Sequence, residues 1–154
     1  STSRGLGDVY KRQADNLVIS GSDFDFYNQS EGTLYLEAQK RDAGSVYNFT
    51  IGNGTLANRI AATNNSIFVT QGGTGNTATS ITLPNNQLYR LAASFRSGDS
   101  KVSVNGSSEA AVAASTLPTS TGITLGGRQD DTNAQKLNGH LKRLIYWPVS
   151  SDSL

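Results

Sequence analysis

The segment "LYRLAASFRSGDSKVSVNG", residues 88–106, decides the fold class. On both sides of the turn "SGDS", apolar residues alternate with polar ones. The apolar set is Tyr89, Leu91, Ala93, Phe95, Val102 and Val104. A period of two is typical of a strand with one buried face and one wet face, and a polar turn joins two such strands into a hairpin. The segment therefore predicts an antiparallel hairpin that covers a hydrophobic core.

The same period recurs along the chain. "EGTLYLEAQ" points Leu34, Leu36 and Ala38 inward, and "SVYNFTIGNGT" places Tyr47, Phe49 and Ile51 on one face. Phe24 and Phe26 are expected to share a strand face, and shorter strands are expected in "NRIAAT", "SIFVTQ", "TSITLP" and "GITLGG". "GGTGNTATS" is expected to be a hairpin loop, and "SSEAAVAAS" a loop with at most one helical turn. Turn signals every 8 to 12 residues are typical of an all-β sandwich.

The last strand is expected in "LNGHLKRLIYWP", residues 137–148. Strict alternation would place Leu141 and Leu144 on opposite faces. One extra residue near Lys142 and Arg143, a β-bulge, would instead turn Leu141, Leu144 and Tyr146 all inward. Proline cannot donate to a ladder, so Pro148 must end this strand or lie at an edge.

Composition excludes several classes of function. The 154 residues carry a formal net charge of +1, and only 16% are charged, against about 25% in an average domain. We therefore expect no nucleic-acid partner, and without a long apolar run we expect no membrane insertion. The chain has no cysteine, so it can form neither a disulfide nor a thiolate metal site.

The N-terminal stretch "STSRGLGDVYKRQ" does not share the alternating pattern. "GLGDVYKRQ" resembles the translated adaptor found at the ends of metagenomic gene fragments; a disordered tail or a linker end is the alternative. We therefore predict a tail over residues 1–14 and a single domain over residues 15–150.

The order of these motifs resembles the concanavalin A-like lectin/glucanase superfamily, in particular the laminin-G-like modules at the C-termini of phage tail fibres and tailspikes. "NG" after the valine-rich strand, "LGG" and "LNGHLKRLIYWP" carry the resemblance. It implies a jelly roll, a two-sheet antiparallel β-sandwich. It also implies a bacterial surface polysaccharide or oligosaccharide as partner, an extracellular position on a virion, and a homotrimer formed through a parent fibre.

The sequence favours a binding module over an enzyme. The retaining glucanases of this superfamily carry a Glu-x-Asp-x-Glu run on one strand, and no such run occurs here. No Gly-x-Ser-x-Gly elbow surrounds any serine, so we expect His140 to be structural or an exposed contact rather than a base. A virion assembly domain that binds no sugar and, less favoured, a glycoside hydrolase are the alternatives.

The predicted sugar contacts lie in two loops and on one aromatic residue. Sugar recognition uses flat aromatic rings together with amide, carboxylate and guanidinium groups that meet hydroxyls in pairs. The predicted ligand-binding residues are Asn58, Arg59, Arg128, Gln129, Asp130, Asn133 and Trp147. Arg59 has an alternative role as a structural arginine paired with a buried carboxylate.

No cofactor is expected. Asp130 and Asp131 offer hard oxygen ligands that could hold Ca²⁺, but six to eight oxygens are needed and the spacing of a calcium loop is absent. A solvated polar loop is therefore the favoured reading of this stretch.

Overall fold

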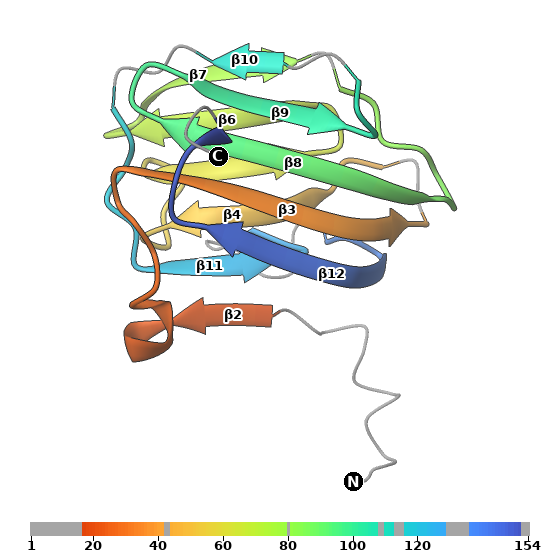
Figure 1. Cartoon of the computed structure of the whole chain (residues 1–154), viewed down its shortest axis with the longest axis horizontal. Helices are drawn as coiled ribbons and strands as arrows, with labels where there is room; N and C mark the ends of the chain where they lie inside the picture. Colours follow the sequence, from red (N-terminus) through yellow and green to blue (C-terminus); the bar gives the residue numbers. More distant parts are fainter. Residues whose placement is uncertain are drawn as a thin grey trace, which may run out of the picture.

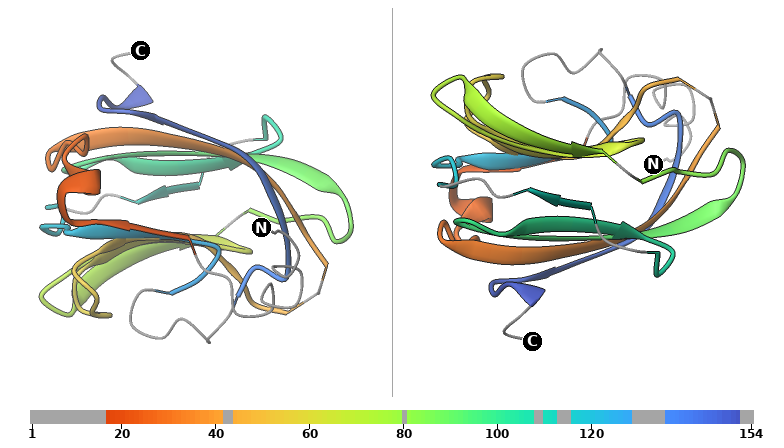
Figure 2. Two further views of the ribbon diagram at one scale, coloured as in Figure 1. Left: turned by 90° about the horizontal axis from the view of Figure 1, so that it is seen from below. Right: turned by 90° about the horizontal axis from the view of Figure 1, so that it is seen from above.

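Two antiparallel sheets stacked face to face make up the fold, as predicted. The computed structural model describes residues 17–41, 44–79, 81–107, 110–112, 116–128 and 136–151. Figure 2 shows the two layers edge-on, with β3 and β12 bending over one end of the sandwich. Within the described ranges, no helix is long and apolar enough to cross a membrane.

The front sheet in Figure 1 has five strands. Their order is β10 (Ala110–Val112), β9 (Ser100–Val104), β8 (Leu88–Arg96), β3 (Glu31–Lys40) and β12 (Gly139–Trp147). The predicted hairpin is β8 and β9, and all four of its apolar residues on β8 are fully buried. The alternation of residues 88–106 therefore placed this sheet on the core correctly.

The second sheet has six strands. Their order is β2 (Leu17–Ser20), β11 (Gly122–Leu125), β4 (Tyr47–Gly52), β5 (Arg59–Thr63), β6 (Ser66–Gln71) and β7 (Thr74–Thr79). Its inner face contributes Phe49, Ile51, Ile60 and Val69 to the core shared with the front sheet.

The bulge predicted in the last strand is confirmed. The pairing of β12 with β3 shifts between Leu141 and Arg143, and β12 is an edge strand that ends at Trp147, immediately before Pro148. The shift turns Leu144 and Tyr146 toward the core. Leu141 pairs with the buried Ala38 and so lies on the predicted inner face, but it is 37% exposed because it lies near the start of the strand, at the open edge of the sheet.

Four local predictions are wrong. "SSEAAVAAS", expected to be a loop with at most one helical turn, contains strand β10. Phe24 ends a short 3-10 helix, η2 (Gly21–Phe24), so it does not share a strand face with Phe26. The expected loop "GGTGNTATS" contains strand β7, and only Gly72 and Gly73 form the turn. "TSITLP" forms no strand in its described part, residues 81–84, although two of its side chains are buried.

The Gly72–Gly73 turn supplies a test of this register. Both residues have positive φ, 60° and 79°, as a two-residue hairpin turn of type I′ requires. A Cβ at Gly73 would meet nothing within 4 Å. Gly73→Ala is therefore expected to lower the free energy of unfolding by about 1–2 kcal/mol through backbone strain alone.

Gly44→Ala is the matched control, because a Cβ there also meets nothing within 4 Å and Gly44 has no positive φ. Urea unfolding measures the free energy of unfolding of both variants and of the parent. Equal stabilities would contradict the turn type described here.

Candidate functional site

Arg59 is the predicted contact residue that the structure places most distinctively. It begins β5 on the outer face of the six-stranded sheet, because the next residue, Ile60, points into the core. Its guanidinium carbon lies 5.5 Å from the centre of the Tyr47 ring and 5.4 Å from that of Phe68. Its Nη1 donates to the Tyr47 hydroxyl at 3.1 Å. Two rings and one hydrogen bond therefore hold the cation in one orientation.

The bulge at Asn48 makes this arrangement possible. Tyr47 pairs with Thr63 and Phe49 pairs with Ala62, so Asn48 is the extra residue between them. Strict alternation would turn Tyr47 inward with Phe49. The bulge turns Tyr47 to the outer face beside Arg59, which corrects the predicted face of this tyrosine.

The guanidinium of Arg59 is only partly satisfied. Within the described residues its Nε is buried without a hydrogen-bond partner, and no carboxylate contacts it. Its Nη2 also has no partner there and is not among the buried atoms, so it is open to solvent. Among the described residues, Arg59 therefore does not pair with a buried carboxylate, which was the alternative role.

Asn58 has a structural role. Its Oδ1 accepts a hydrogen bond from the backbone N–H of Gly72 at 3.0 Å, and its own carbonyl accepts from Asn53. These bonds tie the loop before β5 to the β6–β7 turn. The side chain of Asn58 therefore positions the start of β5, where Arg59 lies.

The second predicted loop begins on the same outer face. Thr50 on β4 donates its hydroxyl to the Gly127 carbonyl at 2.9 Å, which brings the chain before Arg128 against this sheet. Arg128 is half-buried. Gln129, Asp130, Asp131 and Asn133 lie outside the described residues, so their roles in sugar or calcium binding stay predictions. Among the residues that are described, no group of three or more His, Cys, Asp or Glu could hold a metal ion.

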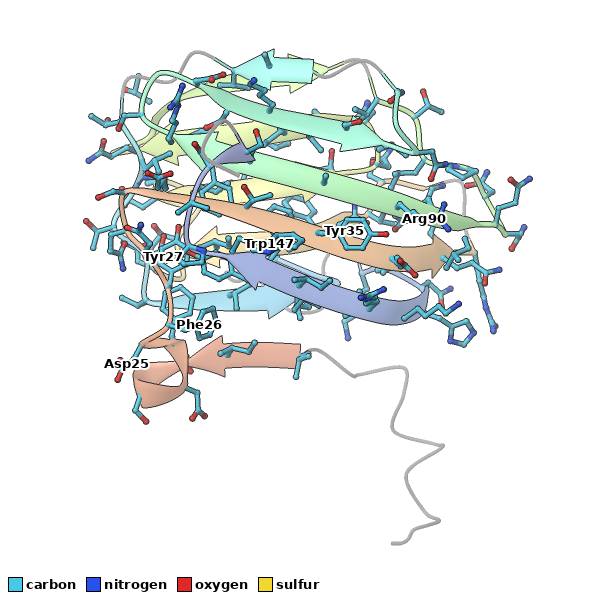
Figure 3. The ribbon with its side chains drawn as sticks, viewed as in Figure 1. Asp25, Phe26, Tyr27, Tyr35, Arg90 and Trp147 are labelled. Atoms are coloured by element: carbon cyan, nitrogen blue, oxygen red, sulfur yellow. The ribbon has the colours of Figure 1, made fainter. Side chains whose placement is uncertain are left out.

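Trp147 lies on the opposite side of the sandwich from Arg59. It pairs with Thr33 on β3, is 36% exposed, and faces outward from the five-stranded sheet (Figure 3). The predicted contacts therefore divide between two faces. Trp147 cannot contact the same small ligand as Arg59, because the two sheets and the core lie between them.

The two glutamates of β3 are not placed as the carboxylate pair of a glycosidase, and His140 lies at the surface. His140 is exposed, and its Nε2 lies 3.2 Å from Nη2 of Arg41. Glu31 and Glu37 both lie on β3 but are six residues apart, about 20 Å along a strand. That separation is well beyond the roughly 5–10 Å between the two carboxylates of a glycosidase.

The comparisons with known proteins bear on the fold. No protein-family model and no curated protein sequence matches the chain. Solved structures do match. A CBM40 domain of a Ruminococcus gnavus sialidase, bound to α2,3-sialyllactose, has 16% identity and a TM-score of 0.68, over 92% of this chain and 96% of that domain. Tailspike protein 2 of an Escherichia coli O157:H7 bacteriophage has 13% identity and a TM-score of 0.68, over 90% of this chain and 22% of the tailspike.

Domains LG4-5 of the mouse laminin α1 chain match with 16% identity and a TM-score of 0.63. The match covers 85% of this chain and 37% of the laminin chain, so this chain spans little more than a third of that protein. The chain therefore has the concanavalin A-like lectin/glucanase fold, as the resemblance implied.

Proposed function

We propose that this domain is a non-catalytic carbohydrate-binding module and that Arg59 contacts the glycan. The observation that carries the proposal is the orientation of this guanidinium between Tyr47 and Phe68, with Nη2 open to solvent. A cation held in place before the ligand arrives loses little side-chain entropy on binding. A buried Nε without a partner costs stability, so Arg59 is a poor choice for a purely structural residue.

The chemistry of Arg59 favours an acidic sugar. A guanidinium is planar and always charged, and it binds carboxylates through parallel N–H···O bonds. The polar neighbours of Arg59 on this face, such as its strand partner Thr70, suit hydroxyl groups. The bound sialyllactose of the CBM40 domain, a neighbour in fold, supports an acidic glycan as the ligand class.

The setting that we propose is an extracellular one, on a phage tail fibre or a related virion protein that attaches to bacterial surface polysaccharide. The similarity in fold to a phage tailspike supports this setting. Each site on a shallow sheet face would bind weakly, and copies linked in a homotrimeric fibre would supply avidity.

Substitution of Arg59 tests the proposal. α2,3-Sialyllactose is the acidic probe and lactose its neutral counterpart. Arg59→Ala is expected to weaken sialyllactose binding by about 10- to 100-fold, the value of a hydrogen bond to a charged group. Arg59→Lys keeps the charge but loses the planar fork, so it is expected to fall between Ala and the parent. Isothermal titration calorimetry measures the affinity of the parent, Arg59→Ala and Arg59→Lys for each sugar.

Arg41→Ala is the matched control, since it removes an equal charge from an exposed residue that directly follows β3, on the other sheet. Thermal unfolding verifies that each variant is folded. Absence of binding by the parent, equal binding of the two sugars, or unchanged binding in Arg59→Ala would each overturn the proposal.

A further inference from the structure

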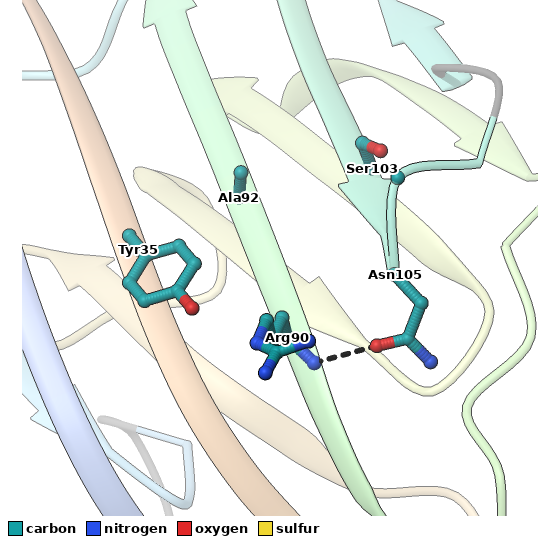
Figure 4. A pocket seen from close by; sticks show the side chains of 6 residues that line it. Tyr35, Arg90, Ala92, Ser103 and Asn105 are labelled. Carbon is teal, nitrogen blue, oxygen red and sulfur yellow. Dashed lines mark hydrogen bonds between the residues drawn. The ribbon is translucent and has the colours of Figure 1, made fainter.

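The outer face of the five-stranded sheet contains a hollow that is lined by none of the predicted ligand-binding residues. It has a volume of about 450 Å³ and spans β3, β8 and β9 (Figure 4). Its lining residues are Tyr35, Arg90, Ala92, Ser103, Asn105 and Gly106. The hollow lies on the side of the sandwich opposite to Arg59.

Strand register creates the hollow. Tyr35 on β3 pairs with Ala92 on β8, and Ala92 pairs with Ser103 on β9. All three point outward, because their neighbours along each strand are buried. The methyl group of Ala92 thus lies between the Tyr35 ring and the Ser103 hydroxyl. Tyr35 and Ser103 are two strand spacings, or about 9.5 Å, apart. Ala92 forms the floor of the hollow, and the ring of Tyr35 forms one wall.

The wall is fixed in place. The Tyr35 hydroxyl donates to Oε2 of Glu37 at 2.6 Å, and the same carboxylate oxygen lies 3.9 Å from Nε of Arg90. The hydrogen bond from Tyr35 is the largest cause of a lowered pKa at Glu37, with Arg90 adding to it, so the carboxylate is charged at neutral pH. Tyr35 therefore holds one ring orientation, and Oε1 of Glu37, beside the lining residues Tyr35 and Arg90, is left as an acceptor.

The opposite wall is also preorganised. Oδ1 of Asn105 accepts from the backbone N–H of Arg90 at 2.8 Å, and the backbone N–H of Asn105 donates to the Arg90 carbonyl at 2.8 Å. These bonds fix the amide and leave its Nδ2 as a donor. Ser103 donates its hydroxyl to the Ser107 carbonyl at 2.8 Å, which leaves its oxygen as an acceptor.

We propose that this hollow is a second saccharide site, which binds a neutral hexopyranose unit. The C–H face of the sugar packs on the Tyr35 ring, whose electron-rich face suits it. Neighbouring hydroxyl groups of the sugar donate hydrogen bonds to the Ser103 oxygen or to Oε1 of Glu37. They accept hydrogen bonds from Nδ2 of Asn105 or from the Arg90 guanidinium. The site favours a neutral sugar, because the only charged residue of its lining, Arg90, already has a carboxylate partner in Glu37 at 3.9 Å. A few fixed polar groups around an apolar surface is the usual composition of a small-molecule site.

This site is independent of the function proposed for Arg59. With both sites occupied, one domain would bind sugars of two chemical classes on opposite faces. It would then cross-link two glycan chains, or two segments of one chain, without forming an oligomer.

Amide chemical shifts in NMR spectra of the parent protein test the proposal. The probes are the methyl α- and β-glycosides of glucose, galactose and mannose at high millimolar concentration. At least one is expected to shift the amides around Tyr35, Ala92 and Asn105 while leaving those around Arg59 and Phe68 in place. If none of the six shifts the first group, the proposal is wrong, whatever sialyllactose does at Arg59.

Two substitutions to leucine sharpen the test. Ala92→Leu fills the floor of the hollow and is expected to weaken binding of the responding glycoside at least tenfold. Ala111→Leu makes the same change on the outer face of β10, where Ala111 pairs with Lys101, and is expected to leave binding unchanged. Both positions are exposed, so both variants should fold. Equal binding by Ala92→Leu and the parent would place the sugar elsewhere and overturn the proposal.

Discussion

Phe95→Ala is expected to lower the free energy of unfolding by about 3–5 kcal/mol, the cost of removing a large, fully buried aromatic side chain. Phe95 is 0% exposed and stacks on Tyr27 with ring centres 6.3 Å apart. It also lies directly across from Gly32 on β3, where an added Cβ would come within 2.8 Å of its ring. The ring thus fills the space that a side chain at Gly32 would otherwise occupy. Urea unfolding followed by circular dichroism measures the loss.

Phe26→Ala is the matched control. Phe26 is 49% exposed and touches Phe24 and Tyr146 edge-on, at 5.7 and 5.3 Å between ring centres. Its removal is expected to cost about 1 kcal/mol, the value of such ring contacts. A cost for Phe95→Ala no greater than for Phe26→Ala would contradict the burial of Phe95 in the core.

The strands that could be predicted are those with one wet face. On β8 every inward residue is apolar, as are Leu34, Leu36 and Ala38 on β3, and most outward residues of both strands are polar or charged. The period of two is therefore unambiguous over these stretches. The bulge in β12 could be predicted for the same reason, because a break in an otherwise regular period is itself a signal.

The strands that were missed lie at or near sheet edges, where burial does not enforce a pattern. β2 exposes both Leu17 and Val18, so it shows no alternation between a buried and a wet side. β7 is built from threonine, glycine, asparagine and alanine, a composition typical of loops. The converse error occurs at Ile81 and Leu83, which alternate in the sequence and are buried in the core but belong to no strand.

The candidate sites show a similar division. Arg59 could be selected from its residue type and its neighbours, but not the two rings that hold it, because the bulge at Asn48 decides which face Tyr47 occupies. The hollow beside Tyr35 could not be predicted at all. It depends on the register that sets Ala92 between Tyr35 and Ser103, and the pairing of Tyr35 with Ala92 joins residues more than fifty positions apart.

Asn48→Ala is expected to destabilise the fold by roughly 3–5 kcal/mol, although Asn48 is polar and lies in a strand. The side chain is fully buried. Its Oδ1 accepts from the Tyr89 hydroxyl at 2.5 Å, and its Nδ2 donates to the carbonyls of Ala62 and Thr63 at 3.5 and 3.1 Å. The two bonds lost from Nδ2 cost about 1 kcal/mol each, and the Tyr89 hydroxyl left without an acceptor costs about 1–3 kcal/mol more. Urea unfolding measures the total.

A double-mutant cycle with Tyr89→Phe separates these contributions. Tyr89→Phe alone is expected to cost about 1–3 kcal/mol, since it leaves Oδ1 of Asn48 buried without a donor. The double variant should cost less than the sum of the two single variants, because neither partner is then left unpaired. The same pair predicts a pH dependence. Burial raises the pKa of Tyr89. The folded state therefore keeps this proton where the unfolded chain releases it, so the free energy of unfolding of the parent falls as the pH rises above about 10. The free energy of unfolding of Tyr89→Phe is expected to fall less over that range. Additive costs, together with an unchanged alkaline slope, would contradict the buried pair that connects the two sheets.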